Sequence, residues 1–186
     1  IAARTSGGGA TRTGEGSGGA AIDSILAEGG GQLVCTVAND NDPSQVVISG
    51  HRAAIERAIT PKTSAIYFAT PNNPDGTMRT RDELLAIAAL AERHRLWILA
   101  DEVYEHYGYD AAHVSIAALP EAADRTVTVF SFAKSYAQAG LRVGYAIGPA
   151  AVIATVRKLA NHSVYNVAVA MQRAALGAMQ AGGGFL

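Results

Sequence analysis

One segment of this sequence, residues 127–145, combines reactive side chains with the pattern of elements that would position them. Two apolar runs, the second at 143–147, flank a loop of small residues that carries Ser131, Lys134 and Arg142. A lysine confined between apolar runs is partly desolvated, which lowers its pKa and leaves a neutral amine able to attack carbonyl carbons. An arginine offers a rigid fork of donors suited to a phosphate or a carboxylate. The segment therefore predicts covalent chemistry on a carbonyl compound that carries an anionic group.

The connection between these two apolar runs is short. A parallel crossover with its own helix needs a dozen or more residues. The strand that starts at Val127 and the strand predicted at 142–147 should therefore run antiparallel.

A second group of polar side chains follows the apolar run at 64–69, which predicts a buried strand. The loop Thr70-Pro-Asn-Asn-Pro-Asp-Gly-Thr77 contains turn dipeptides and carries Asn73. Ligands bind at the carboxyl ends of the strands in open α/β sheets, so the position of this loop adds a functional interpretation to the plain turn.

A third group follows the continuous apolar run Leu96–Ala100, which is typical of a strand buried on both faces. Asp101 comes directly after it, and Tyr104 lies one turn further on. A carboxylate at the end of a buried strand needs a partner, which an ion pair, a helix cap or a ligand can supply. Between the second and third groups, 80–94 predicts an amphipathic crossover helix with a capping box at its start.

The N-terminal part of the chain has weaker patterns. Residues 1–15 are rich in Gly, Ser and Thr and predict a flexible segment. The glycines at 16–20 lead into helical spacing at 21–28, and a glycine turn at a helix start can bind a phosphate. Strands are expected at 32–37 and 46–49, with a polar loop at 38–44 between them and a helix at 51–59 after them.

These three groups together resemble one family. Ser-Phe-Ala-Lys-(x)5-Gly-x-Arg-x-Gly-Tyr resembles the lysine signature of the fold type I pyridoxal-phosphate enzymes, the class I/II aminotransferase superfamily. Asn-Pro-Asp-Gly and Asp-Glu-Val-Tyr resemble two further motifs of that family, and they occur upstream in the family's order. The resemblance covers about residues 16–180 and implies pyridoxal 5'-phosphate (PLP) as cofactor.

The resemblance also implies a role for each matching residue. Lys134 would form a Schiff base with the cofactor and later shuttle the alpha proton. Asp101 would keep the pyridine nitrogen protonated, which makes the ring an electron sink. Asn73 and Tyr104 would donate to the phenolic oxygen, whereas Glu102 would be structural.

The cofactor phosphate has its own matching residues. Ser131 and Arg142 match the phosphate ligands of the lysine motif. The glycine turn before the helix at 21–28 matches the other phosphate-binding spot of the family, which assigns Gly18, Gly19 and Ala20 to the phosphate. The family's ring-stacking aromatic is not matched, because Ala38-Asn-Asp-Asn-Asp42 follows the strand that should precede it.

The implied fold class is a three-layer α/β/α domain with a mostly parallel sheet and one antiparallel strand, as in the aminotransferase large domain. Residues 16–186 would form this PLP-binding domain. The N-terminal arm and the C-terminal small domain, which carries the arginine for the substrate carboxylate, are expected to be missing. The family also implies a homodimer.

Composition narrows the class of protein. The chain has 186 residues, 49% of them hydrophobic, and a net charge of −1, which gives no electrostatic reason to expect nucleic acid or an anionic membrane as partner. One cysteine, Cys35, excludes an internal disulfide framework and fits a reducing, cytoplasmic compartment.

No apolar run is long enough for a membrane span, and no secretory signal is visible. The five histidines lack metal-ligand spacing, and His106 and His113 are assigned no chemistry.

The predicted function is a PLP-dependent aminotransferase that acts on an amino acid and a 2-oxo acid. Three alternatives stay open. Lyases, racemases, cyclases and oxidases of the superfamily use the same residues. A non-catalytic PLP-binding domain of a transcription regulator would need a basic helical domain, which is not visible before residue 20. Ser131 and Lys134 also form a Ser-x-x-Lys pair for acyl transfer, but its partner motif Ser-Asp-Asn is absent.

Overall fold

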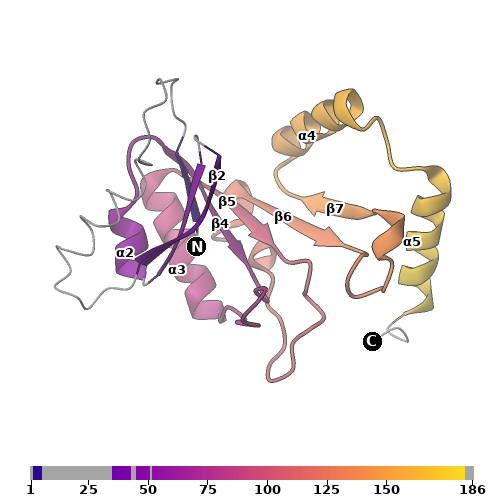
Figure 1. The fold of residues 1–186 in the computed structure, drawn as a ribbon, viewed down its shortest axis with the longest axis horizontal. Helices are drawn as coiled ribbons and strands as arrows, with labels where there is room; N and C mark the ends of the chain where they lie inside the picture. Colours follow the sequence, from indigo (N-terminus) through magenta and orange to yellow (C-terminus); the bar gives the residue numbers. More distant parts are fainter. Residues whose placement is uncertain (1, 6–34, 43–44, 51, 183–186) are drawn as a thin grey trace. The chain divides into compact units, whose positions relative to one another are not determined.

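The computed structural model describes residues 2–5, 35–42, 45–50 and 52–182. It divides into two compact units, residues 1–68 with 89–98 and residues 69–88 with 99–186. Figure 1 shows the ribbon, coloured along the chain. The predicted helix at 21–28 and the glycine turn before it, including Gly18, Gly19 and Ala20, lie outside the described residues.

The main sheet is mixed and mostly parallel, which confirms the predicted α/β class. Its strands follow the order β1-β4-β5-β6-β7. Strand β7 pairs antiparallel with β6, with Val129 opposite Ala146, so the predicted antiparallel strand is confirmed. The strands are β1 Ala2–Thr5, β4 Thr63–Ala69, β5 Trp97–Asp101, β6 Thr126–Ser131 and β7 Gly144–Ile147.

The first unit contains a strand inside the segment that the sequence analysis predicts to be flexible. Strand β1 pairs antiparallel with β4, with Ala3 opposite Ile66. A ladder joins backbone groups, so a short extended stretch can add to a sheet edge without an apolar pattern of its own. This is why composition alone did not reveal it.

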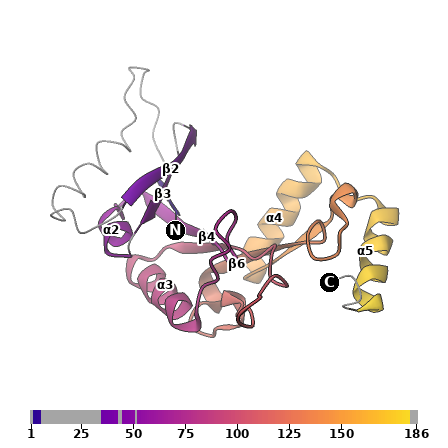
Figure 2. The same ribbon diagram turned by 60° about the horizontal axis from the view of Figure 1, so that its bottom comes forward.

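A two-stranded antiparallel sheet of β2 Cys35–Asp42 and β3 Gln45–Gly50 also belongs to the first unit (Figure 2). The prediction of a polar loop at 38–44 is wrong for residues 38–42, which continue β2. The register shifts twice along this polar half, between Val37 and Asn39 and again before Asp42. Irregular pairing of this kind accommodates polar residues that a regular buried strand would exclude.

The helices that precede and follow β4 along the chain agree with the helices predicted from the sequence. Helix α2 spans Arg52–Arg57, within the predicted 51–59, and its Ile55 is fully buried. Helix α3 spans Arg81–His94. Its capping box is formed, because Thr80 N donates to Glu83 Oε2 at 2.8 Å and Glu83 N donates to Thr80 Oγ1 at 3.3 Å.

Strand β5 is not buried on both faces. Ile98 and Ala100 are buried, whereas Trp97 is 42% and Leu99 is 40% exposed. The continuous apolar run predicted burial everywhere, but the described part of the chain covers one face only. Because side chains alternate along a strand, this pattern predicts on which face of the sheet Asp101 and Glu102 lie.

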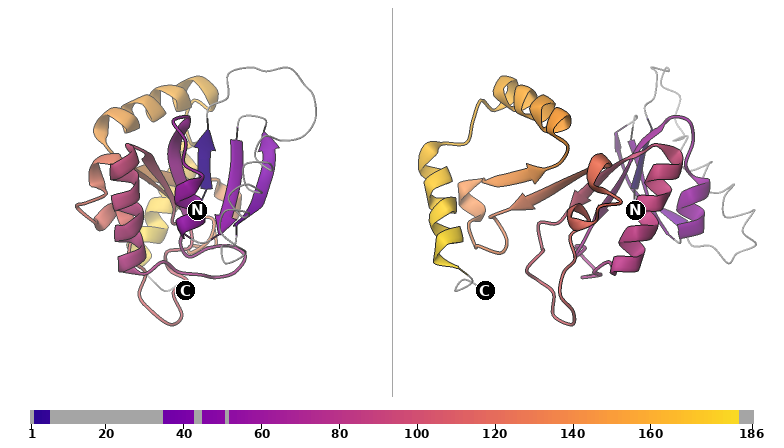
Figure 3. Two further views of the ribbon diagram at one scale, coloured as in Figure 1. Left: turned by 90° about the vertical axis from the view of Figure 1, so that its left-hand side faces the viewer. Right: turned by 180° about the vertical axis from the view of Figure 1, so that it is seen from behind.

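The second unit ends in two helices that follow β7 (Figures 1 and 3). The helical apolar spacing of the sequence also predicts helices at 150–160 and 164–180. In the structure α4 spans Ala150–Ser163 and α5 spans Val169–Ala181, close to these two ranges. Three short 3-10 helices precede them, at Ile116–Ala118, Ala123–Arg125 and Ala139–Leu141. Among the described helices, none has the length and apolar character needed to cross a bilayer.

Candidate functional site

The loop after β4 is tied to the end of β5. The backbone N–H of Thr70 donates to the carbonyl oxygen of Asp101 at 3.0 Å. The buried Thr70 hydroxyl accepts from the backbone N–H of Arg79 at 2.9 Å, which closes the base of the loop. The second and third sequence groups therefore lie next to each other, as strand ends in an open α/β sheet should.

The loop 70–77 holds its own shape through Asp75. Its Oδ1 accepts from Thr77 N and from Asn72 Nδ2, both at 2.9 Å. The Thr77 bond is the main reason that the pKa of Asp75 lies below its usual value. Gly76 has φ +69, which glycine adopts without steric cost. Because these bonds are internal, the exposed Asn73 side chain is left to meet other loops.

Asn73 lies next to Tyr104, as expected for two residues that would donate to the same oxygen atom of a ligand. Asn73 Nδ2 donates to the Tyr104 hydroxyl oxygen at 3.3 Å. This oxygen keeps its own hydrogen, so the pair still has donors for a third oxygen. Tyr104 itself is placed by a backbone turn in which Tyr107 N donates to Tyr104 O at 2.9 Å.

Asp101 and Glu102 occupy opposite faces at the end of β5. Residues alternate along a strand, so Asp101 follows the face of Leu99 and is half-buried, whereas Glu102 follows the face of Ala100 and is fully buried. Asp101 Oδ1 accepts from Val103 N at 3.3 Å. The acidic pair thus separates into one carboxylate that a ligand can reach and one that it cannot.

Lys134 lies in the loop after β6, and its amine faces Tyr104. The Nζ atom is 5.3 Å from the centroid of the Tyr104 ring. Local hydrogen bonds fold the loop: Ala133 N donates to Ser131 Oγ at 3.1 Å, and Ala137 N donates to Lys134 O at 2.9 Å. Lys134 is exposed, so the confinement expected from the sequence is not found in the described part of the chain.

Arg142 has an unusual backbone at the end of the same loop. It takes the left-handed conformation, with φ 55 and ψ 42, at the C-terminal end of the 3-10 helix 139–141. One guanidinium nitrogen donates to Ala139 O at 3.0 Å, and the remaining donors of this exposed side chain are open to a ligand. A left-handed arginine costs free energy and is held here by the loop closure before β7.

The structure brings three of the predicted site residues into contact with one another. Direct contacts link Asn73, Tyr104 and Lys134, and Asp101 is three residues from Tyr104. Ser131 and Arg142 belong to the Lys134 loop. No group of three or more His, Cys, Asp or Glu among the described residues is arranged to hold a metal ion.

Two acidic residues beside the site were not assigned a functional role from the sequence. Glu102 pairs with His113, and Glu105 is half-buried beside them. Burial, with repulsion from Glu102 and opposed by His113, raises the pKa of Glu105 to about 7. The only available signal was the strand alternation, which places Glu102 on the buried face of β5.

The family model "Aminotransferase class I and II" matches residues 23–183. The chain belongs to the class I and II aminotransferase family. Among the relatives in this family, arginine–pyruvate transaminase of Pseudomonas aeruginosa is 43% identical over 66% of this chain and 31% of its own length. A probable aspartate/prephenate aminotransferase of Thermus aquaticus is 39% identical over 67% of this chain and 32% of its own.

Solved structures in the same family agree. Aspartate aminotransferase from Thermus thermophilus with maleate matches with a TM-score of 0.66 and 36% identity, over 69% of this chain and 33% of that chain. N-succinyldiaminopimelate aminotransferase from Mycobacterium tuberculosis matches with a TM-score of 0.68 and 32% identity, over 86% of this chain and 41% of that chain. The matches cover between 31% and 41% of the lengths of these relatives.

Enzymes of this family depend on PLP, and the donor set here fits that cofactor. PLP needs an amine for its aldehyde carbon, an acid for its ring nitrogen, donors for its phenolic oxygen and donors for its phosphate. The half-buried carboxylate of Asp101, the paired donors of Asn73 and Tyr104, and the exposed amine of Lys134 match three of these needs.

Proposed function

We propose that this chain is the cofactor-binding part of a PLP-dependent aminotransferase, which transfers an amino group between an amino acid and a 2-oxo acid. Residues 16–186 would form its PLP-binding large domain. The observation that supports this most strongly is the contact set Asn73–Tyr104–Lys134, in which three separate loops bring their polar groups together in a chain of this family.

Bound PLP supplies an electron-withdrawing ring that accepts the electron pair left at the amino acid's Cα when its proton leaves. Lys134 Nζ would bind the aldehyde carbon of the cofactor and, as a free amine, would accept the proton from Cα. Asp101 keeps a proton on the ring nitrogen through its carboxylate. Tyr104 Oη and Asn73 Nδ2 donate to the phenolic oxygen and orient the ring.

The phosphate of the cofactor is assigned to a second group of residues. Ser131 Oγ uses its oxygen to accept from Ala133 N, which leaves its hydrogen for a phosphate oxygen. The free guanidinium donors of Arg142 give a charge-assisted bond to the same group. Gly18, Gly19 and Ala20 complete the proposed phosphate site.

We further propose a homodimer that works in the cytoplasm in amino acid metabolism, with no nucleic acid or membrane partner. This assembly and setting rest on the family resemblance, on the single cysteine and on the near-zero net charge. Light scattering coupled to size exclusion tests the assembly. A monomer at micromolar concentration with PLP bound would contradict the dimer.

The proposed function is tested by covalent trapping. The purified chain is incubated with PLP, reduced with sodium borohydride and digested, and the modified peptide is identified by mass spectrometry. We expect the adduct on Lys134, and none on the exposed Lys62 or Lys158. The variants Lys62→Ala and Lys158→Ala should retain the adduct, and Lys134→Ala should lose it while keeping the circular dichroism of the parent.

An adduct on another lysine, or no adduct in a folded sample, would overturn the site assignment. Product analysis then separates the reaction types. Keto acid formed together with a new amino acid supports transamination, whereas ammonia or peroxide indicates a lyase or an oxidase of the superfamily.

A further inference from the structure

Glu102 is a fully buried acid that the proposed mechanism does not use. Its side chain is 0% exposed. An ionised carboxylate in such a place is costly unless every oxygen has a partner. Both oxygens have one: Oε1 accepts from the backbone N–H of Ile116 at 3.0 Å, and Oε2 lies 3.1 Å from Nε2 of His113.

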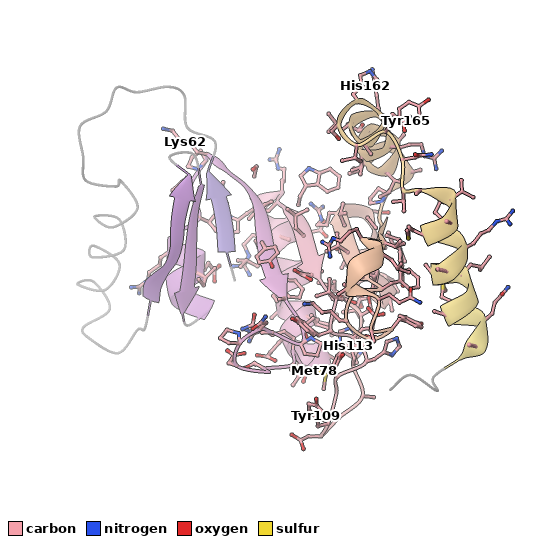
Figure 4. All side chains as sticks on the ribbon, turned by 45° about the vertical axis from the view of Figure 1, so that its right-hand side comes forward. Lys62, Met78, Tyr109, His113, His162 and Tyr165 are labelled. Carbon is pink, nitrogen blue, oxygen red and sulfur yellow. The ribbon has the colours of Figure 1, made fainter. Side chains whose placement is uncertain are left out.

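The backbone of Glu102 is fixed as well. Its N–H donates to the carbonyl oxygen of Val129 on β6 at 3.0 Å, and its carbonyl oxygen accepts from Glu105 N at 3.1 Å. One residue thus connects β6, the turn that carries Tyr104, and the segment 113–116. His113 is only 10% exposed, so this partner is also removed from solvent. Figure 4 shows His113 at the base of the loop whose tip carries Tyr109, which is 89% exposed.

The position of Glu102 gives these contacts a consequence for the site. It lies between Asp101 and the Val103 amide, which donates to the Asp101 carboxylate. Any rotation of the backbone at Glu102 would turn Asp101 on one side and Tyr104 on the other. The 105–113 segment has no regular helix or strand, and the two bonds of the buried carboxylate join its far end, at His113 and Ile116, to the end of β5.

We propose that Glu102, held by His113 and the Ile116 amide, is a positioning residue that fixes the carboxylate of Asp101 and the hydroxyl of Tyr104 relative to each other. The proposal rests on the proposed PLP site, because it concerns how two of that site's residues are aimed. A positioning role would explain why an acid is buried next to the site, where burial of an apolar residue of similar size would cost less free energy.

The test uses Glu102→Ala, with Glu102→Gln as the conservative variant and the exposed Glu121→Gln as the matched control. Glutamine keeps the acceptor for Ile116 N and can donate to His113 once the imidazole changes tautomer. His113→Ala removes the other half of the pair. If Glu102→Ala does not fold, His113→Ala and Glu102→Gln carry the comparison.

The first readout needs no cofactor. Hydrogen exchange and the side-chain amide resonances of Asn73 are followed in the free chain. We expect Glu102→Ala or His113→Ala to speed exchange at least tenfold at Val103, Tyr104 and Ile116, and to shift the Asn73 amide signals, while strand β6 stays protected. Glu102→Gln and Glu121→Gln should resemble the parent.

The second readout is the dissociation constant of PLP and the pH at which the absorption band of the bound cofactor changes. If Asp101 or Tyr104 is misplaced, one hydrogen bond to the cofactor is lost, which corresponds to about a tenfold change in the dissociation constant. Glu102→Ala should weaken binding about tenfold and move the spectral transition, and Glu102→Gln should restore most of both. A purely structural role would lower stability and leave the transition unchanged.

The outcomes separate the two proposals. A parent chain that traps no PLP on Lys134 contradicts the proposed function, and the exchange data still decide the role of Glu102. Uniform exchange changes across the chain, or an unchanged Val103 amide and Asn73 signal in folded Glu102→Ala, would overturn the positioning role.

Discussion

At the scale of single residues, three acids at and beside the site differ in their surroundings. Asp101 is half-buried on the accessible face of the strand end, Glu102 is fully buried and paired, and Glu105 is half-buried with one carboxylate oxygen that lacks a hydrogen-bond partner. Its other oxygen lies 3.4 Å from Nε2 of His106. Three acids within five positions thus meet three environments.

Glu105 predicts a pH dependence of stability. Its pKa is raised from 4.5 to about 7 by burial, so between these values the folded chain holds a proton that the unfolded chain has released. This contribution is fully present below pH 4.5 and is lost as the pH rises through 7. The side chain of Glu105→Gln does not titrate, so its stability should not fall in this way. Relative to the parent, its free energy of unfolding should be on the order of 2 kcal/mol higher at pH 8 than at pH 5.

Urea unfolding of the parent and of Glu105→Gln from pH 4 to pH 9 measures this difference. Glu121→Gln is the control, because Glu121 is exposed. Parallel stability curves for the parent and Glu105→Gln over the whole range would show that Glu105 titrates normally.

At the scale of elements, the fold delivers polar loops from the ends of strands. Loop 70–77 follows β4, the turn at Tyr104 follows β5, and the Lys134 loop follows β6. The hydrogen bonds from Thr70 N to Asp101 O and from Glu102 N to Val129 O join these three strand ends. The backbone therefore sets which side chains meet, and the side chains add few contacts of their own.

The left-handed backbone of Arg142 predicts that replacing this residue has opposite effects on the stability of the free chain and on its affinity for PLP. Glycine adopts this conformation without strain, so Arg142→Gly should stabilise the free chain by about 0.5–1 kcal/mol. The same change removes a phosphate donor and should weaken PLP binding about tenfold or more. Arg142→Lys retains the charge but lacks the fork, so its affinity should lie between the two.

Unfolding in urea and titration with PLP check both halves of this prediction. A destabilised Arg142→Gly would mean that the Ala139 contact outweighs the backbone strain. Unchanged PLP affinity would remove Arg142 from the phosphate site.

Local rules predicted much of this architecture. The capping box at Thr80, the antiparallel β7 and the helices α3, α4 and α5 follow from spacing and turn residues alone. The β1 pairing and the polar half of β2 could not be predicted, because backbone ladders leave no apolar period in such short segments. Glu102 was assigned a structural role, but its partner His113 lies eleven residues away across an irregular segment, and no sequence period links them.

At the scale of the whole molecule, the chain contains the proposed cofactor site and spans about a third of the length of relatives such as arginine–pyruvate transaminase. A ligand that binds only the folded state stabilises it by mass action, by about 2.7 kcal/mol at a hundredfold excess over its dissociation constant. PLP should therefore raise the melting temperature by several degrees. Lys134→Ala should show a smaller rise, and pyridoxal, which lacks the phosphate, a smaller one still.

Scanning fluorimetry over a PLP concentration series provides this measurement, with Lys158→Ala as a control that keeps the full shift. A shift that is equal in the parent and in Lys134→Ala would indicate binding that does not use this lysine.

The most direct test of the central claim is a crystal structure of the chain loaded with PLP. The account predicts continuous density from Lys134 Nζ to the cofactor, with Asp101 within hydrogen-bond distance of the ring nitrogen and with Tyr104 and Asn73 at the phenolic oxygen. Cofactor attached to another residue, or an Asp101 carboxylate turned away from the ring, would contradict it.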